Sequence, residues 1–342
     1  MKRNEGYVKG LLFEVVLKEL VKKSGFTIDE HISQANVKNT KLHGRSGVHQ
    51  IDVLGVFRLG IPFVNPLLLM GEAKNFNKQV GLKEAREFLG TYIDIVQYNR
   101  INTKSRSSNR SEEILQPKYT YCPVYFSMKG YQQSAQHFMF AHGINFFSYE
   151  NSEIMERLAK KIAGLLTQIR FQKMKTDDFK NFRELLSINN IPQNLKKDDF
   201  KKAHDKLVSY INSVNSFVGV LDRRFPIHIL TEKKTIPKKP GKINLEIMQV
   251  NSFKMKTQAK RQIGQFSLPR TFISDYLRVA KKQGSGESAF QQIDIIASVK
   301  DNLVVINFKI DETSRSNILT LFKQQIYDRT QLPSLESTES LD

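Results

Sequence analysis

Glu72 and Lys74 lie two positions apart in the stretch MGEAKNFNKQVG, residues 70–81. The preceding run, Leu67-Leu68-Leu69, is apolar and indicates a buried strand that continues into this stretch. Side chains at positions i and i+2 of a strand point to the same face. The pattern therefore predicts a carboxylate and an ammonium group side by side where the strand leaves the core.

Asp52 lies on the strand that we expect to precede this one. Its neighbours Ile51 and Val53 are apolar and would face the core, so Asp52 would face the other way. If the two strands are adjacent, two carboxylates and one lysine meet at a single point. Carboxylate oxygens suit Mg²⁺, which lowers the pKa of a bound water, and a lysine beside that water can orient it. These groups are the minimum set for metal-dependent hydrolysis of a phosphodiester.

The order of these residues resembles a known family. Gln50-Ile51-Asp52 followed by Gly71-Glu72-Ala73-Lys74 resembles the core of the PD-(D/E)xK nucleases, and more narrowly the Mrr-like restriction endonuclease group. That group opens with a helix that carries an aromatic–Glu pair, here Phe13-Glu14. The segments KNFNKQVGLKEAREFLG and PVYFSMKGYQQSAQHFMFAHGINFFSYE are similar to its later elements, so the resemblance covers roughly residues 5–150.

The resemblance implies a role for each matching residue. Asp52 and Glu72 would bind the metal, which is Mg²⁺ with Mn²⁺ as a substitute, and Lys74 would position or activate the attacking water. Glu14 would be an auxiliary carboxylate, and Gln79 would lie beside the active site. The chain departs from the family pattern in two ways: His49-Gln50-Ile51 replaces the usual proline and acidic residue, and the gap before Glu72 is long.

Basic residues near this region are candidate contacts for a nucleic acid. Arg45 and His49 belong to the turn HGRSGVH, where they could contact phosphate or simply join two strands. Arg100, Lys104 and Arg106 lie in RINTKSRSSNRSEE, which we expect to be an exposed loop because it is polar and rich in Ser and Asn. A solvated loop without a ligand is the alternative for this second set.

The composition indicates a polyanion as partner. The formal net charge is +19 in 342 residues, and both halves of the chain are net basic, so the charge is not confined to a tail. The single cysteine excludes an intrachain disulfide and a thiolate zinc cluster, and no long apolar run or signal-peptide pattern is present. We therefore expect a cytoplasmic protein with DNA as partner and no membrane association.

The elements predict an α/β protein with a restriction-endonuclease-like core, a mixed sheet flanked by helices, followed by a C-terminal α+β accessory region. The expected division is a nuclease domain at 1–168, a helical connector at 169–222, and a strand-rich domain at 223–342 for recognition, regulation or oligomerisation. The resulting hypothesis is a Mg²⁺-dependent DNA endonuclease of restriction or anti-phage defence, as a homodimer or higher oligomer, with a further protein of the defence system as partner. Two alternatives stay open: a nucleic-acid-binding scaffold that does not cleave, and a nuclease that acts on RNA or branched DNA.

Overall fold

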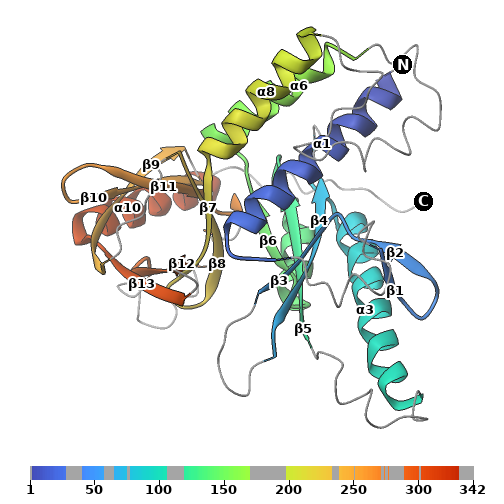
Figure 1. The fold of residues 1–342 in the computed structure, drawn as a ribbon. Coiled ribbons are helices and arrows are strands. Elements are labelled where there is room, and N and C mark those ends of the chain that lie inside the picture. The colour runs from blue at the N-terminus through green and yellow to red at the C-terminus, as the bar shows by residue number, and fades with distance from the viewer. Residues whose placement is uncertain are drawn as a thin grey trace, which may run out of the picture.

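The computed structural model consists of an N-terminal mixed sheet covered by helices and a C-terminal β-barrel (Figure 1). It describes residues 2–27, 41–57, 65–74, 78–105, 119–169, 198–232, 239–249, 251–270, 273, 276, 289–299 and 302–330. The described helices are α1 (Lys2–Lys23), α3 (Leu82–Ser105), α5 (Gln133–Ala141), α6 (Glu153–Leu166), α8 (Asp198–Ser213) and α10 (Glu312–Thr330).

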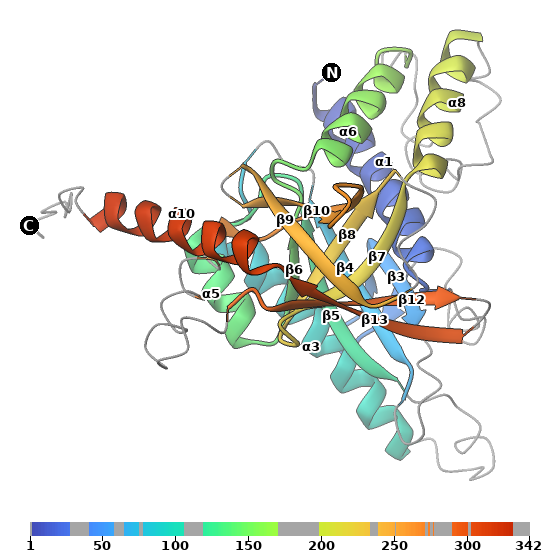
Figure 2. The ribbon, with the colours of Figure 1, turned by 90° about the vertical axis from the view of Figure 1, so that its left-hand side faces the viewer.

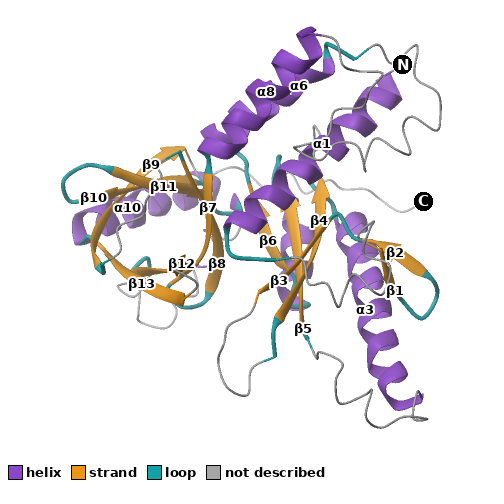
Figure 3. Cartoon of the chain, in the orientation of Figure 1, coloured by secondary structure: helices purple, strands orange, loops and turns teal. Residues whose placement is uncertain are grey.

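The strands fall into three sheets, shown in orange in Figure 3. The first part of the chain contains β1 (Lys41–His43), β2 (Val48–Gln50), β3 (Val53–Phe57), β4 (Leu67–Lys74), β5 (Thr120–Ser127) and β6 (Asn145–Ser148). The second part contains β7 (Asn215–Leu221), β8 (Phe225–Thr231), β9 (Gly241–Gln249), β10 (Ser252–Thr257), β11 (Gln262–Ser267), β12 (Gln292–Val299) and β13 (Asn302–Ile310).

The N-terminal sheet has the strand order β3-β4-β5-β6. Strands β3 and β4 are antiparallel, with Val53 opposite Gly71. Strands β4, β5 and β6 are parallel, and Glu72 lies beside Tyr125. All five residues of β3 are buried, as expected of a strand that is covered on both faces. The prediction of a mixed α/β architecture is confirmed at this level.

Helices cover both faces of this sheet. On one face α1 and α6 form a core with the sheet, in which Leu17 and Ile162 share a cluster with Phe126 of β5. On the other face α3 and α5 place Phe88 and Met139 in a cluster with Tyr125. Because neighbouring residues of a strand point to opposite faces, Tyr125 and Phe126 belong to different cores.

The second half of the chain closes into a seven-stranded barrel with the order β10-β11-β8-β7-β12-β13-β9 (Figure 2). Its strands pair antiparallel except for β13 and β9, which run parallel. Apolar side chains fill the interior, and α10 adds Ile318 and Phe322 to this core. The strand-rich composition was predicted, but the closed ring was not. Closure pairs the edge strands, which would otherwise expose unpaired backbone groups.

Buried polar contacts join the barrel to the first half of the chain. Ser24, just after α1, bonds the Oγ of Ser216 on β7 at 2.7 Å. The Oγ of Ser216 lies 2.5 Å from Nε2 of His228 on β8, and the hydroxyl of Tyr149, which follows β6, lies 2.6 Å from Nδ1 of the same ring. The two parts are therefore joined by a continuous set of buried hydrogen bonds, which we call the seam. Its members are Ser24, Ser216, His228 and Tyr149.

Three expectations about local structure are corrected. Asp52 is a bend residue before β3, because β2 ends at Gln50 and the chain turns before the sheet begins. The stretch that begins at Arg100 is helical as far as Ser105, because polar residues lower helix propensity without breaking a helix as proline does. The barrel begins at Asn215, inside the range expected to be a helical connector, and residues 170–197 of that range lie outside the described residues. No helix in the described part of the chain is long and apolar enough to cross a membrane.

Candidate active site

Asp52 is held against β4 by the backbone. Its side chain is buried, and its Oδ2 accepts a hydrogen bond from the backbone N–H of Ala73 at 3.0 Å. The residue lies one position before the pair of Val53 and Gly71, so the antiparallel register brings it beside Glu72. The bend before β3 thus turns the carboxylate toward the same end of β4 that carries the other two groups of the predicted site.

Glu72 and Lys74 form a close ion pair at the end of β4. The Nζ of Lys74 lies 2.5 Å from Oε1 of Glu72, and both side chains are about a quarter exposed, at 27% and 23%. Ala73 between them is buried, so the strand alternates as the sequence predicts. Their partial exposure leaves room for a ligand to reach both groups, which a fully buried pair would not allow.

Glu14 of α1 joins this group from a third element. Its side chain is 8% exposed on a helix that otherwise buries apolar residues against the sheet. Burial by itself would lower the pKa of the Lys74 ammonium, but the charges of Glu72, Asp52 and Glu14 raise it, and the net shift is upward. Three carboxylates from α1, the bend before β3, and β4 therefore lie in the electrostatic field of one lysine.

The donor set fits a hard divalent cation that keeps part of its water. In the described residues no group of three or more His, Cys, Asp or Glu side chains could hold a metal ion. Mg²⁺ at phosphate sites takes one or two carboxylates and completes its shell with water and phosphate oxygens. Asp52 and Glu72, the carboxylates that flank the end of β4, are the residues here that would hold it.

Gln79 comes after β4 in the chain. It is exposed in the segment between β4 and α3. The next residue, Val80, is fixed to the end of β5, since its N–H bonds the carbonyl of Gly130 at 3.0 Å and its carbonyl accepts from the N–H of Gln132 at 2.9 Å. Val80 is therefore paired with the residues that follow β5, and a role for Gln79 beside the active site stays a prediction.

The turn that carries Arg45 and His49 is fastened to α3. Nε2 of His49 lies 2.7 Å from Oδ2 of Asp94, and Nη1 of Arg45 donates to Oε1 of Gln97 at 3.0 Å. Hydrogen bonds from His49 and from Ser46 lower the pKa of the Asp94 carboxyl. These contacts give both residues a structural partner on the helix, and their contact with nucleic acid stays a prediction.

The other basic candidates lie at the far end of α3. Arg100 and Lys104 belong to the last turns of that helix, as Figure 1 shows by its extension away from the sheet. Arg106 lies outside the described residues. Arg100 and Lys104 therefore lie at the opposite end of α3 from Leu82, where the helix begins.

Two residues that contact or neighbour the predicted site residues were missed by reasoning from the sequence. Asp94 lies 45 residues from His49, and no local pattern links them. Tyr125 pairs with Glu72 across β4 and β5, and a count along the two strands could find it only once their parallel register is known. Both omissions concern contacts between elements that are distant in the chain.

Comparisons with known proteins give little help. No family model matches the chain, and no curated protein matches it. A crystal structure titled as a protein of unknown function, AF1548, aligns with 58% of this chain and 96% of its own, at 13% sequence identity and a TM-score of 0.29. A likeness at that level carries no argument about fold or function.

Proposed function

We propose that this protein is a metal-dependent DNA endonuclease with a PD-(D/E)xK core. The observation that carries the proposal is the convergence of Asp52, Glu72 and Glu14 on Lys74 at the end of β4. A pair of solvent-facing residues on an ordinary strand would not need two further buried carboxylates from other elements. Burial of charged groups is costly, so their grouping is better explained by a ligand than by stability.

Asp52 and Glu72 are the residues that would hold a divalent cation. When bound, Mg²⁺ would lower the pKa of a water ligand and offset the charge of the scissile phosphate. The backbone N–H of Ala73 holds one oxygen of the Asp52 carboxylate. Because the carboxylate group is rigid, this hydrogen bond also sets the direction of the other oxygen. Glu14, on α1, would act on the cation through water.

Lys74 has the properties of a hydrogen-bond donor. Its pKa is raised, so the side chain is an ammonium group at neutral pH and cannot accept a proton from water. An ammonium group with three N–H bonds can orient an attacking water and stabilise negative charge on phosphate oxygens. In this role Lys74 would exchange its contact with Glu72 for contacts with the substrate.

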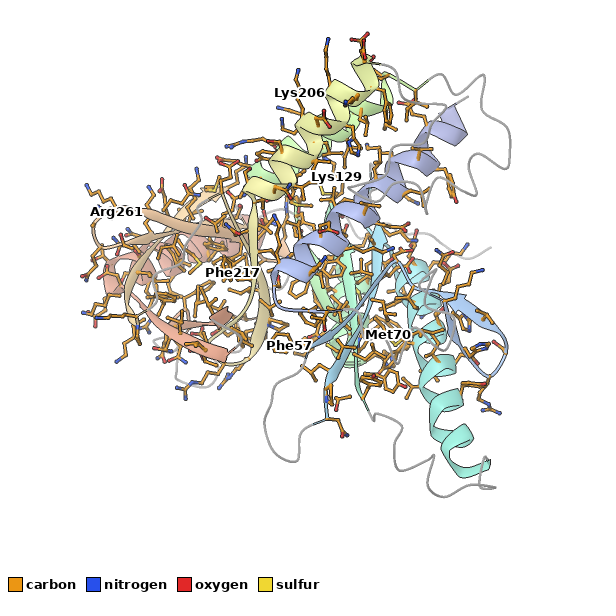
Figure 4. The ribbon with its side chains drawn as sticks, viewed as in Figure 1. Phe57, Met70, Lys129, Lys206, Phe217 and Arg261 are labelled. Atoms are coloured by element: carbon orange, nitrogen blue, oxygen red, sulfur yellow. The ribbon has the colours of Figure 1, made fainter. Side chains whose placement is uncertain are left out.

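The charge of the molecule supports a nucleic acid as substrate. Exposed basic side chains lie on α8 and on the turns of the barrel, where Figure 4 shows Lys206 and Arg261 at the surface. Other members of this set are Lys201, Lys202, Arg223 and Lys260. Together with the net charge of +19 they would bind a polyanionic backbone without reading its sequence.

A cleavage assay tests the proposal. Plasmid, linear duplex, single-stranded DNA and RNA are incubated with Mg²⁺, Mn²⁺ or EDTA and with wild type, Asp52→Asn or Glu72→Gln. Glu156→Gln, which alters an exposed carboxylate of α6 outside the site, is the matched control. We expect cutting of DNA that requires the metal, persists in Glu156→Gln and disappears in both site variants. Cutting that persists in Glu72→Gln would refute the site. Salt-sensitive binding of DNA without cutting would favour a nucleic-acid-binding scaffold. Cutting of RNA but not of DNA would mean that the substrate is RNA.

A further inference from the structure

Tyr125 is placed next to the candidate site by the register of the sheet. It lies on β5 directly beside Glu72 of β4, and paired residues of parallel strands point to the same face. Its side chain is fully buried. The ring packs edge-on against Phe88 of α3, with centroids 5.4 Å apart, and against Tyr131, with centroids 6.0 Å apart. Packing on both sides fixes the direction of the hydroxyl.

The hydroxyl of Tyr125 has no hydrogen-bond partner among the residues that the structure describes. The two other buried tyrosines nearby differ in this respect. The hydroxyl of Tyr131 donates to the carbonyls of Tyr125 and Phe147 at 2.8 and 2.9 Å, and that of Tyr149 pairs with His228. A buried hydroxyl without a partner destabilises a fold, so such a group calls for an explanation in terms of function.

The surroundings of this hydroxyl are acidic. Burial raises the pKa of Tyr125 first, and the charges of Glu72, Glu84, Asp52 and Glu87 raise it further. The phenol therefore keeps its proton at neutral pH, and the group can act as a donor toward a carboxylate. Glu84 and Glu87 belong to the first turns of α3, the helix that also supplies Phe88 to the packing around this ring.

We propose that Tyr125 is a positioning residue, whose hydroxyl donates a hydrogen bond to the Glu72 carboxylate, directly or through one water, when Lys74 turns to the substrate. This inference rests on the proposed nuclease function and adds a residue to its site. In the structure Lys74 holds Oε1 of Glu72 at 2.5 Å. When that contact is exchanged for phosphate, the hydroxyl of Tyr125 on the adjacent strand can take the place of the ammonium group as a donor to the carboxylate.

The test is Tyr125→Phe, which removes only the hydroxyl and keeps the packed ring. Outer hydrogen bonds to metal-binding carboxylates are worth roughly 10-fold to 100-fold in metal affinity or activity. We expect the Mg²⁺ concentration for half-maximal cutting to rise about 10-fold, and Mn²⁺ affinity, measured by calorimetry without DNA, to fall by a similar factor. The urea midpoint of unfolding should stay the same or rise, because an unpaired buried hydroxyl has been removed.

Tyr121→Phe is the matched control, since Tyr121 lies on the same strand and its electrostatic partner is Tyr92, away from the carboxylates. It should leave Mn²⁺ affinity and cutting unchanged. Wild-type cutting with an unaltered metal requirement in Tyr125→Phe would overturn the role of Tyr125 and leave the nuclease proposal intact. A fall in the unfolding midpoint that accounts for the lost activity would also overturn it, as a packing effect. A wild-type protein that neither cuts nor binds Mn²⁺ would overturn both proposals.

Discussion

We predict that the free energy of unfolding falls as the pH is lowered through the range where histidine titrates, because the seam between barrel and sheet contains a buried histidine. His228 is buried at the centre of this seam, and its ring contacts Phe126, Phe147 and Tyr149. Both ring nitrogens are within hydrogen-bond distance of a hydroxyl, that of Ser216 at 2.5 Å and that of Tyr149 at 2.6 Å. One nitrogen can donate and the other accept only if the ring is neutral.

The magnitude follows from the pKa of this ring. Burial lowers the pKa of His228 from 6.5 to about 4 in the folded protein, and the unfolded chain keeps the ordinary value. Between these two pH values the unfolded state binds a proton that the folded state does not, so stability falls as the pH is lowered. One pKa unit corresponds to about 1.4 kcal/mol, so the loss is about 2 kcal/mol at pH 5 and about 3 kcal/mol at pH 4. Above pH 6.5 the ring is neutral in both states and contributes no pH dependence.

The assay compares wild type with His228→Gln, whose amide offers a donor and an acceptor but does not titrate. Urea unfolding is measured for both proteins at pH 7, 6 and 5, and the free energies are subtracted at each pH so that other titrating groups cancel. Relative to His228→Gln, wild type should lose about 2 kcal/mol between pH 7 and pH 5. A difference that stays constant over this range would show that His228 is protonated or solvated in the folded protein, and the burial argument would fail.

The remaining predictions concern the sheet, the β1–β2 turn and the charge. Gly71→Ala should destabilise the fold by about 1–3 kcal/mol in urea, because a Cβ there would lie 2.9 Å from Phe126 and from Val53 in a packed sheet; an unchanged midpoint would contradict the packing. Asp94→Ala should speed tryptic cleavage after Arg45, because the turn loses its acceptor on α3; equal digestion rates would show that the carboxylate does not hold the turn. DNA affinity should fall steeply with salt, with log Kd linear in log salt concentration, and a flat response would remove phosphate neutralisation as the source of binding.

The sequence by itself determined the residues that could do chemistry and the strand that carries Glu72 and Lys74, but it wrongly placed Asp52 on a strand. Alternation around Ala73 was enough to place Glu72 and Lys74 on one face, because the two-residue period of a strand is a local property. Glu14 could be included only through the family resemblance, since nothing local distinguishes a carboxylate on α1 that is buried from one that is exposed. The helices and strands of the first half were readable because each has an apolar pattern of its own.

Only the tertiary structure decided which distant residues meet. The closure of the barrel through the parallel pair of β13 and β9 depends on strands far apart in the chain, and so does the seam at His228. The parallel register that brings Tyr125 beside Glu72 is set by the crossover through α3. The apolar pattern of a strand indicates how deeply the strand is buried, but it does not indicate which strand lies next to it. Strand pairing is fixed by packing between elements and by the cost of leaving backbone groups unpaired.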